Sequence, residues 1–125
     1  MKNAILVGAL IFSILSILPA AANAAHDSEY CNQNQMQGNE CAIERADAAD
    51  KELNRLYKEI LSRQDDEQKK QLLEAQRAWV AYKEKECKWE ADQYKGGSIS
   101  PMMYSACLER LTNERNSYFK MLADQ

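Results

Sequence analysis

The sequence predicts an all-α protein, a small antiparallel bundle of three main helices that follows a short N-terminal segment and is braced by two disulfides. Apolar residues recur at helical spacing from residue 39 almost to the end of the 125-residue chain. A charged break near residue 64 and a glycine pair at residues 96–97 divide this pattern into three stretches. Four cysteines follow residue 30, which is typical of a small, disulfide-stabilised domain.

Residues 1–24 are predicted to be a cleavable signal peptide. Lys2 gives a positive start, residues 4–18 form an uncharged apolar run, and residues 22–24 have the Ala-Asn-Ala pattern that signal peptidase recognises. A membrane anchor is disfavoured, because the run is short for a span of about 20 residues and ends in a cleavage site. We therefore expect residues 25–125 to form one helical domain that is periplasmic or secreted, with no membrane contact after cleavage.

The charge balance narrows the class of partner. The chain has a formal net charge of −3, and removing Lys2 with the signal peptide makes it −4. An acidic domain disfavours nucleic acid as a ligand. It mildly favours a cationic partner.

The cysteines predict two disulfides and no metal site. They are Cys31, Cys41, Cys87 and Cys107. A metal site is disfavoured, because there is no C-x-x-C pair and the one histidine lies beside the new N-terminus, and we expect no other cofactor. Antiparallel helices would bring three of the four cysteines to one end of the bundle, with the fourth close by. All three pairings stay open at this point, although near-symmetry about the glycine pair favours Cys87–Cys107 with Cys31–Cys41.

The first two helices are expected at residues 39–62 and 65–94, with Asp65 as the N-cap of the second. One apolar stripe defines the first helix: Ala42, Ala46, Ala49, Leu53, Leu56 and Ile60. The second carries a stripe of Leu72, Ala75, Trp79, Tyr82, Glu86 and Trp89, beside a shorter row of Leu73, Val80 and Cys87. Two apolar rows predict that this helix is the middle member of the bundle.

A third helix is expected to begin with Ser100 as its N-cap and Pro101 in its first turn. Its predicted buried row includes Leu111, Arg115 and Tyr118. We expect Arg115 to stack on Trp79 or to pair with a carboxylate such as Asp50, which is a structural role.

Two features are candidates for binding. The aromatic row Trp79, Tyr82 and Trp89 is predicted to be core, with a binding face as the alternative. The connection before the third helix could insert into the cleft of a partner, or could be a plain helix–helix turn. Its candidate partner-binding residues are Lys95, Gly96, Gly97 and Ser98. We predict no catalytic residues, because nothing in the spacing selects a nucleophile–base arrangement or a carboxylate pair.

Several strings resemble the LprI-like lysozyme-inhibitor family of bacterial envelope proteins. They are residues 41–57, residues 73–82 with Cys87, the Gly96-Gly97-Ser98 turn, Cys107 and residues 111–115. The resemblance implies a periplasmic or cell-surface helical domain that inhibits lysozyme. The expected function is thus an exported envelope binding protein that blocks a cationic lysozyme sterically. The alternative is a structural or accessory periplasmic module that binds another envelope protein, and an enzyme ranks third. The oligomeric state stays open.

Export can be tested by intact mass. The exported product should begin at Ala25 and weigh less than the reduced chain by two hydrogen atoms for each disulfide. Retention of residues 1–24, or free thiols in the native protein, would contradict this prediction.

Overall fold

The computed structural model describes residues 28–125, which fold into three long helices and a short helical segment at residues 28–31. The long helices are α2 (Gln35–Ser62), α3 (Asp66–Asp92) and α4 (Ser100–Ala123), and the described residues contain no strand. The predicted all-α bundle is therefore confirmed. The predicted signal peptide and its cleavage site lie outside the described residues.

The helix ends follow local hydrogen bonding. Helix α2 begins four residues earlier than predicted, because the Asn34 side chain accepts a hydrogen bond from the Gln37 amide at 3.0 Å. Asp65 is confirmed as the cap of α3, since it accepts from the Gln68 amide at 2.8 Å. The prediction that Ser100 caps α4 is wrong: Ser100 is already helical, and its hydroxyl donates to the Ala91 carbonyl at 3.0 Å.

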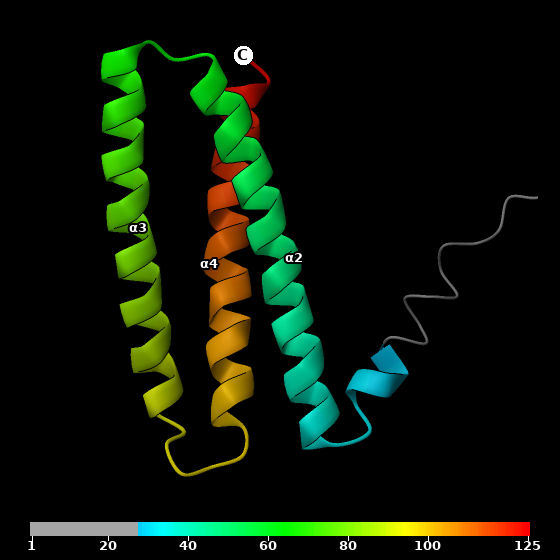
Figure 1. Ribbon diagram of the computed structural model, residues 1–125. Helices are drawn as coiled ribbons and strands as arrows, with labels where there is room; N and C mark the ends of the chain where they lie inside the picture. Colours follow the sequence, from blue (N-terminus) through cyan, green and yellow to red (C-terminus); the bar gives the residue numbers. More distant parts are fainter. Residues whose placement is uncertain (1–27) are drawn as a thin grey trace, which may run out of the picture.

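Helix α4 lies at the centre of the bundle, contrary to the prediction that the middle member is the second long helix. It packs closely against α2 and less extensively against α3, whereas α2 and α3 make few close backbone approaches to each other. Figure 1 shows α4 behind and between its two neighbours, with α3 standing apart from α2. The outer side of α3 is consequently without a helical neighbour within residues 28–125.

Small and polar side chains explain why α4 packs so closely on α2. The buried face of α2 begins with Ala42, Ala46 and Ala49, which keep the two backbones close. The buried face of α4 includes polar side chains, among them Thr112 and Asn116. Asn116 donates to the Ala49 carbonyl at 2.9 Å across this interface. Reasoning from large apolar side chains alone missed an interface built from small and polar ones.

Helix α3 is held to α4 around a disulfide. Cys87 and Cys107 are bonded, and together with Leu111 they form a buried cluster. The only buried residues of α3 are Lys83, Cys87 and Ala91. Its attachment therefore depends on few contacts, and one of them is covalent.

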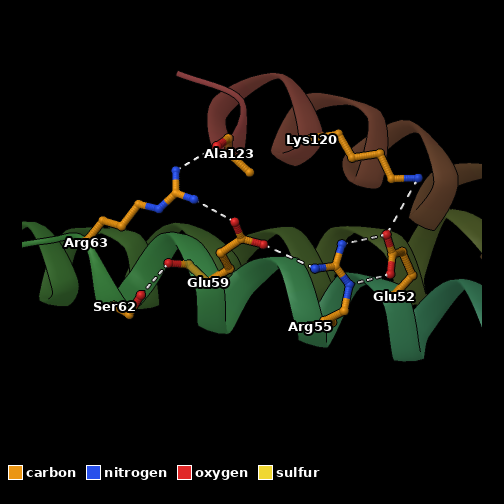
Figure 2. A network of polar contacts seen from close by, with 7 residues as sticks. All are labelled: Glu52, Arg55, Glu59, Ser62, Arg63, Lys120 and Ala123. Atoms are coloured by element: carbon orange, nitrogen blue, oxygen red, sulfur yellow. Dashed lines mark hydrogen bonds and ion pairs between the residues drawn. The ribbon is translucent and has the colours of Figure 1, made fainter.

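The end of the bundle remote from the α3–α4 loop is held by an apolar cluster and an ionic network. The cluster consists of Leu53, Leu56, Ile60 and Phe119, with Leu72 and Trp79 of α3 packed against it. Figure 2 shows the network, in which Glu52 accepts from Arg55 and pairs with Lys120 of α4 at 3.6 Å. The chain of contacts continues through Glu59 to Arg63, which donates to the Ala123 carbonyl at 2.6 Å. These contacts fasten the end of α4 along α2.

The assignment of the aromatic row of α3 to the core is wrong for Tyr82 and Trp89, which are exposed, and is confirmed in part for Trp79, which packs against the apolar cluster. Trp79 is half-buried, but Tyr82 is 52% exposed and Trp89 is 61% exposed. Tyr82 and Trp89 face solvent because α3 has only α4 as a close neighbour. The stacking of Arg115 on Trp79 is confirmed, at 5.6 Å from the guanidinium carbon to the ring centre. Asp50 is not its partner, since that carboxylate lies 3.8 Å from the ammonium of Lys83.

Phe119→Ala should lower the free energy of unfolding by about 3–5 kcal/mol, because Phe119 is fully buried in the three-helix cluster. Urea denaturation followed by circular dichroism measures the change. Met121→Ala is the control, since Met121 is 54% exposed on the same helix and should cost less than about 0.5 kcal/mol. Equal effects of the two substitutions would contradict this account of the core.

Candidate functional site

The connection between α3 and α4, residues 93–99, is a tight and exposed loop, and we call it the α3–α4 loop. Residues 92–98 are all exposed. Gly96 has a φ of +89°, a conformation that other residues rarely adopt. The Gly97 amide donates to the Tyr94 carbonyl at 3.0 Å, and the Ser100 amide donates to the Gly97 carbonyl at 3.3 Å. The glycine pair thus reverses the chain within a compact turn.

The beginning of α2 supports this loop. Figure 1 shows the start of α2, the end of α3 and the start of α4 at the same end of the bundle. The Asn39 side chain donates to the Ser98 carbonyl at 3.4 Å. Gly38 is buried where α2 meets Met102 of α4, and a Cβ there would lie 3.3 Å from the Met102 sulfur. This close approach explains why a glycine can occupy the first turn of a long helix.

Two disulfides brace the same end. Cys31–Cys41 ties the segment before α2 to the first turns of that helix, and Cys87–Cys107 joins α3 to α4. This is the pairing that near-symmetry about the glycine pair favoured. The described residues contain no free cysteine. The loop is therefore presented by a cross-linked end of the bundle, which limits its conformational freedom.

Exposed aromatic side chains adjoin the loop. Trp89, in the last turns of α3, is 61% exposed, and Tyr94, inside the loop, is 42% exposed. On the last turns of α3 Lys88 donates to Asp92 at 2.9 Å, and this hydrogen bond lowers the pKa of the Asp92 carboxyl. Aromatic side chains with a polar atom are well suited to protein contacts, because they bury a large area with little loss of rotamer freedom.

An acidic row runs along the first half of α2, on the side of the helix that faces away from its buried residues. Glu40, Glu44 and Asp47 are exposed and spaced by four and three residues, and none of them has an ion-pair partner within residues 28–125. Tyr30 donates to Glu40 at 2.9 Å, and this hydrogen bond, together with the negative charge of Glu40, raises the pKa of the Tyr30 hydroxyl. Unpaired carboxylates give this surface a local negative potential.

A polar groove of about 310 Å³ lies between α2 and α4. Two cross-helix ion pairs lie along it, Arg45–Glu109 at 3.2 Å and Glu52–Lys120 at 3.6 Å. The buried Asn116 also lines the groove, and its Oδ1 has no hydrogen-bond partner among the described residues. Because the charges across the groove pair with each other, its main effect is to join the two helices.

Helix α3 contains one buried lysine, Lys83, which lies near side chains of the other two helices. Lys83 lies 3.5 Å from the Thr112 hydroxyl, 3.8 Å from the Asp50 carboxylate and 4.8 Å from the centre of the Trp79 ring. Its ammonium therefore has a counter-ion and an aromatic face, which together offset burial. The arrangement links all three helices. Residues 28–125 contain no group of three or more potential metal ligands.

The neighbouring Arg115 has a similar structural role. Its guanidinium donates to the Gln76 amide oxygen at 3.2 and 3.3 Å, and its carbon lies 4.6 Å from the centre of the Phe119 ring. Burial beside these groups lowers the pKa of Arg115. Because it joins α3 to the core, Arg115 is a framework residue.

Sequence reasoning selected the α3–α4 loop but missed its surroundings. The helical pattern begins at residue 39 but does not predict the contact of Asn39 with the loop, and the aromatic spacing predicts that Trp89 is core. A signal was available for Trp89: its row also contains Glu86, and Lys85 and Lys88 lie nearby, which is more typical of a solvated face. None of the long helices of residues 28–125 has the length and apolar character needed to cross a bilayer.

Comparison with known proteins gives two matches. The family model described as Lysozyme inhibitor LprI matches residues 26–118. A protein described as uncharacterized, from Rhizobium meliloti (strain 1021), is 32% identical over 127 aligned positions, which cover 90% of this chain and 91% of the relative. No solved structure matches significantly.

Removing the Cys87–Cys107 disulfide should loosen the candidate surface. The double variant Cys87→Ala/Cys107→Ala should lose about 2–4 kcal/mol of stability and exchange amide hydrogens faster in residues 88–99. Hydrogen exchange with mass spectrometry measures both local and global opening. The matched control, Cys31→Ala/Cys41→Ala, should leave exchange in α3 unchanged. Unaltered exchange in residues 88–99 of the first variant would show that the disulfide does not hold the loop.

Proposed function

Because the chain belongs to the LprI lysozyme-inhibitor family, we propose that it is an exported envelope protein that binds a cationic lysozyme and blocks its cleft sterically. An inhibitor of this kind needs no catalytic group of its own. It needs a rigid surface that keeps its shape when it enters an enzyme cleft. Family membership and two disulfides are consistent with a protein outside the cytoplasm. The periplasm or the medium, reached by way of a cleaved signal peptide, is the more specific part of the proposal.

One observation carries the proposal furthest: the disulfide-braced end of the bundle presents an exposed loop with aromatic side chains beside it. Residues 95–98 turn on a glycine at positive φ and are all exposed. Trp89 and Tyr94 adjoin them and are exposed. A loop that is already ordered loses little entropy when it binds, so more of its contact energy appears as affinity.

Charge supports the choice of a basic enzyme. Glu40, Glu44 and Asp47 form an exposed acidic row on the outer side of the same helix whose start supports the loop, and none of them has an ion-pair partner within residues 28–125. Such a row would accelerate the encounter with a cationic protein, and the acceleration would weaken as salt screens it. In this arrangement the loop blocks the cleft of the enzyme, and the acidic row accelerates the encounter of the two proteins.

The alternative is an accessory module that binds another envelope protein. The exposed aromatic side chains of α3 favour it, since Tyr82 lies well away from the loop. An enzyme is disfavoured because LprI is a family of inhibitors.

A lysis assay with matched variants tests the proposal. The purified, oxidised protein should slow lysozyme-driven clearing of a cell-wall suspension at near-stoichiometric ratio, and the effect should weaken as salt rises. Ser98→Arg should reduce inhibition by about tenfold or more, because it adds bulk and positive charge to the loop. The matched control Ser62→Arg makes the same change in the last turn of α2, at the opposite end of the bundle.

Two outcomes would contradict the proposal. No inhibition at large molar excess, with helicity confirmed by circular dichroism, rejects lysozyme as the target and favours the accessory module. Equal inhibition by the Ser98→Arg and Ser62→Arg variants moves the interface away from the loop. Asp47→Lys should then show whether the acidic row contributes to binding. A loss of inhibition that is greater at low salt than at high salt is expected only for a charge that guides association.

A further inference from the structure

The outer side of α3 carries a stripe of exposed side chains that extends along most of the helix. Its members are spaced alternately by four and three residues: Gln71, Ala75, Ala78, Tyr82, Lys85 and Trp89. All six are exposed. Cys87 and Ala91, which face α4, lie about half a helical turn from Trp89 and Tyr82 respectively. The stripe therefore points directly away from the bundle, where neither α2 nor α4 can cover it.

The spacing of the stripe is that of a coiled-coil seam. Apolar or long side chains at alternating intervals of three and four residues keep one face of a helix toward a second helix. Two members, Tyr82 and Trp89, are large and more than half exposed, while Ala75 and Ala78 are small. A helix that places large side chains on one part of its seam and small ones on another can pack against its own inverted copy.

We propose that α3 pairs with α3 of a second copy of this chain, antiparallel and about a two-fold axis near residue 81. In that register Tyr82 of one copy lies over Ala78 of the other. Trp89 lies over the turn that contains Gln71 and Ala75, and the stem of Lys85 also crosses Ala75. Each large side chain then meets a small one. A two-fold interface of this kind uses the same surface on both copies.

The flanking charges agree with the antiparallel register. Glu74 and Lys88 are both exposed and lie on the same flank of the stripe, seven residues before and after Ala81. The two-fold axis places Glu74 of one copy beside Lys88 of the other, and the reciprocal pair forms at the far side. A parallel arrangement would instead set Trp89 against Trp89 and Lys85 against Lys85. Because Lys85 lies in the stripe and Lys88 on its flank, the surface is also a poor match for a uniformly basic partner.

The pairing leaves the α3–α4 loop with Tyr94 free and covers Trp89, the one residue that the stripe shares with the candidate inhibitory surface. Because the helices run in opposite directions, the two α3–α4 loops lie at opposite ends of the dimer. The interface is one helix pair, which places it at the small end of protein interfaces, so dimerisation should depend on concentration. Because Ala78 belongs only to the stripe and Ser98 only to the loop, the Ala78→Arg and Ser98→Arg variants test dimerisation and lysozyme inhibition separately, and either proposal can fail without the other.

Sedimentation velocity of the oxidised protein over a wide concentration range tests the proposal. The protein should sediment as a monomer when dilute and as a dimer when concentrated. Glu74→Lys and Lys88→Glu should each raise the dimer dissociation constant by about tenfold, because each replaces two attractions with two repulsions. The double variant Glu74→Lys/Lys88→Glu should restore dimerisation, whereas Glu84→Lys, off the stripe, should leave it unchanged.

A second variant examines the packing. Ala78→Arg places a long, charged side chain where Tyr82 of the other copy should lie, and should abolish the dimer while circular dichroism stays unchanged. A protein that is monomeric at every concentration overturns the proposal. So does a dimer that survives Ala78→Arg, or one that the charge exchange fails to restore. Capture of another protein by the stripe of a monomeric chain would assign the surface to that partner instead.

Discussion

The Cys87–Cys107 disulfide is the constraint on which the position of α3 depends. Helix α3 approaches only α4 closely and buries only three residues, one of which is Cys87. By the chain-entropy argument, a disulfide that closes a loop of this size contributes about 3 kcal/mol to the free energy of unfolding. That is a large share of the stability of a small domain. The same bond fixes the two ends of the α3–α4 loop. Covalent attachment thereby allows α3 to keep its outer side uncovered without separating from the bundle.

The two ends of the bundle are stabilised in different ways. At the end remote from the loop, Phe119 and the leucines of α2 form an apolar cluster, and the network from Glu52 to Arg63 joins α2 to the end of α4. The contacts of that network are exposed, so each contributes little by itself, and the apolar cluster dominates there. At the loop end the helices meet through alanines, Gly38 and polar side chains. Those small contacts bury little apolar area, which explains why both disulfides are found there.

Much of the fold could be predicted from the sequence because helical periodicity and turn residues are local signals. The three helices and the Asp65 cap are examples, whereas the stacking of Arg115 on Trp79 joins two helices and was one of two alternatives that the sequence left open. The central place of α4 could not be predicted in this way, because it depends on the close approach permitted by Ala42, Ala46 and Ala49. A stripe of alanines is a poor candidate for the main helix contact when side chains are ranked by size. It nevertheless allows the two backbones to approach most closely. The exposure of Trp89 was missed for the same reason, since it follows from which helix lacks a neighbour.

The candidate surface was harder to predict than the fold, since it is assembled from separate segments. The glycine pair marks the loop in the sequence, but the contact of Asn39 with the Ser98 carbonyl joins residues 59 positions apart. No periodic pattern encodes such a contact. The acidic row of α2 becomes informative only when its carboxylates are seen to lack ion-pair partners within residues 28–125, whereas Glu52 and Glu59 on the same helix are neutralised by arginines. A count of charged residues indicates the sign of the partner's charge. Only the arrangement of ion pairs indicates which side of the bundle the partner would approach.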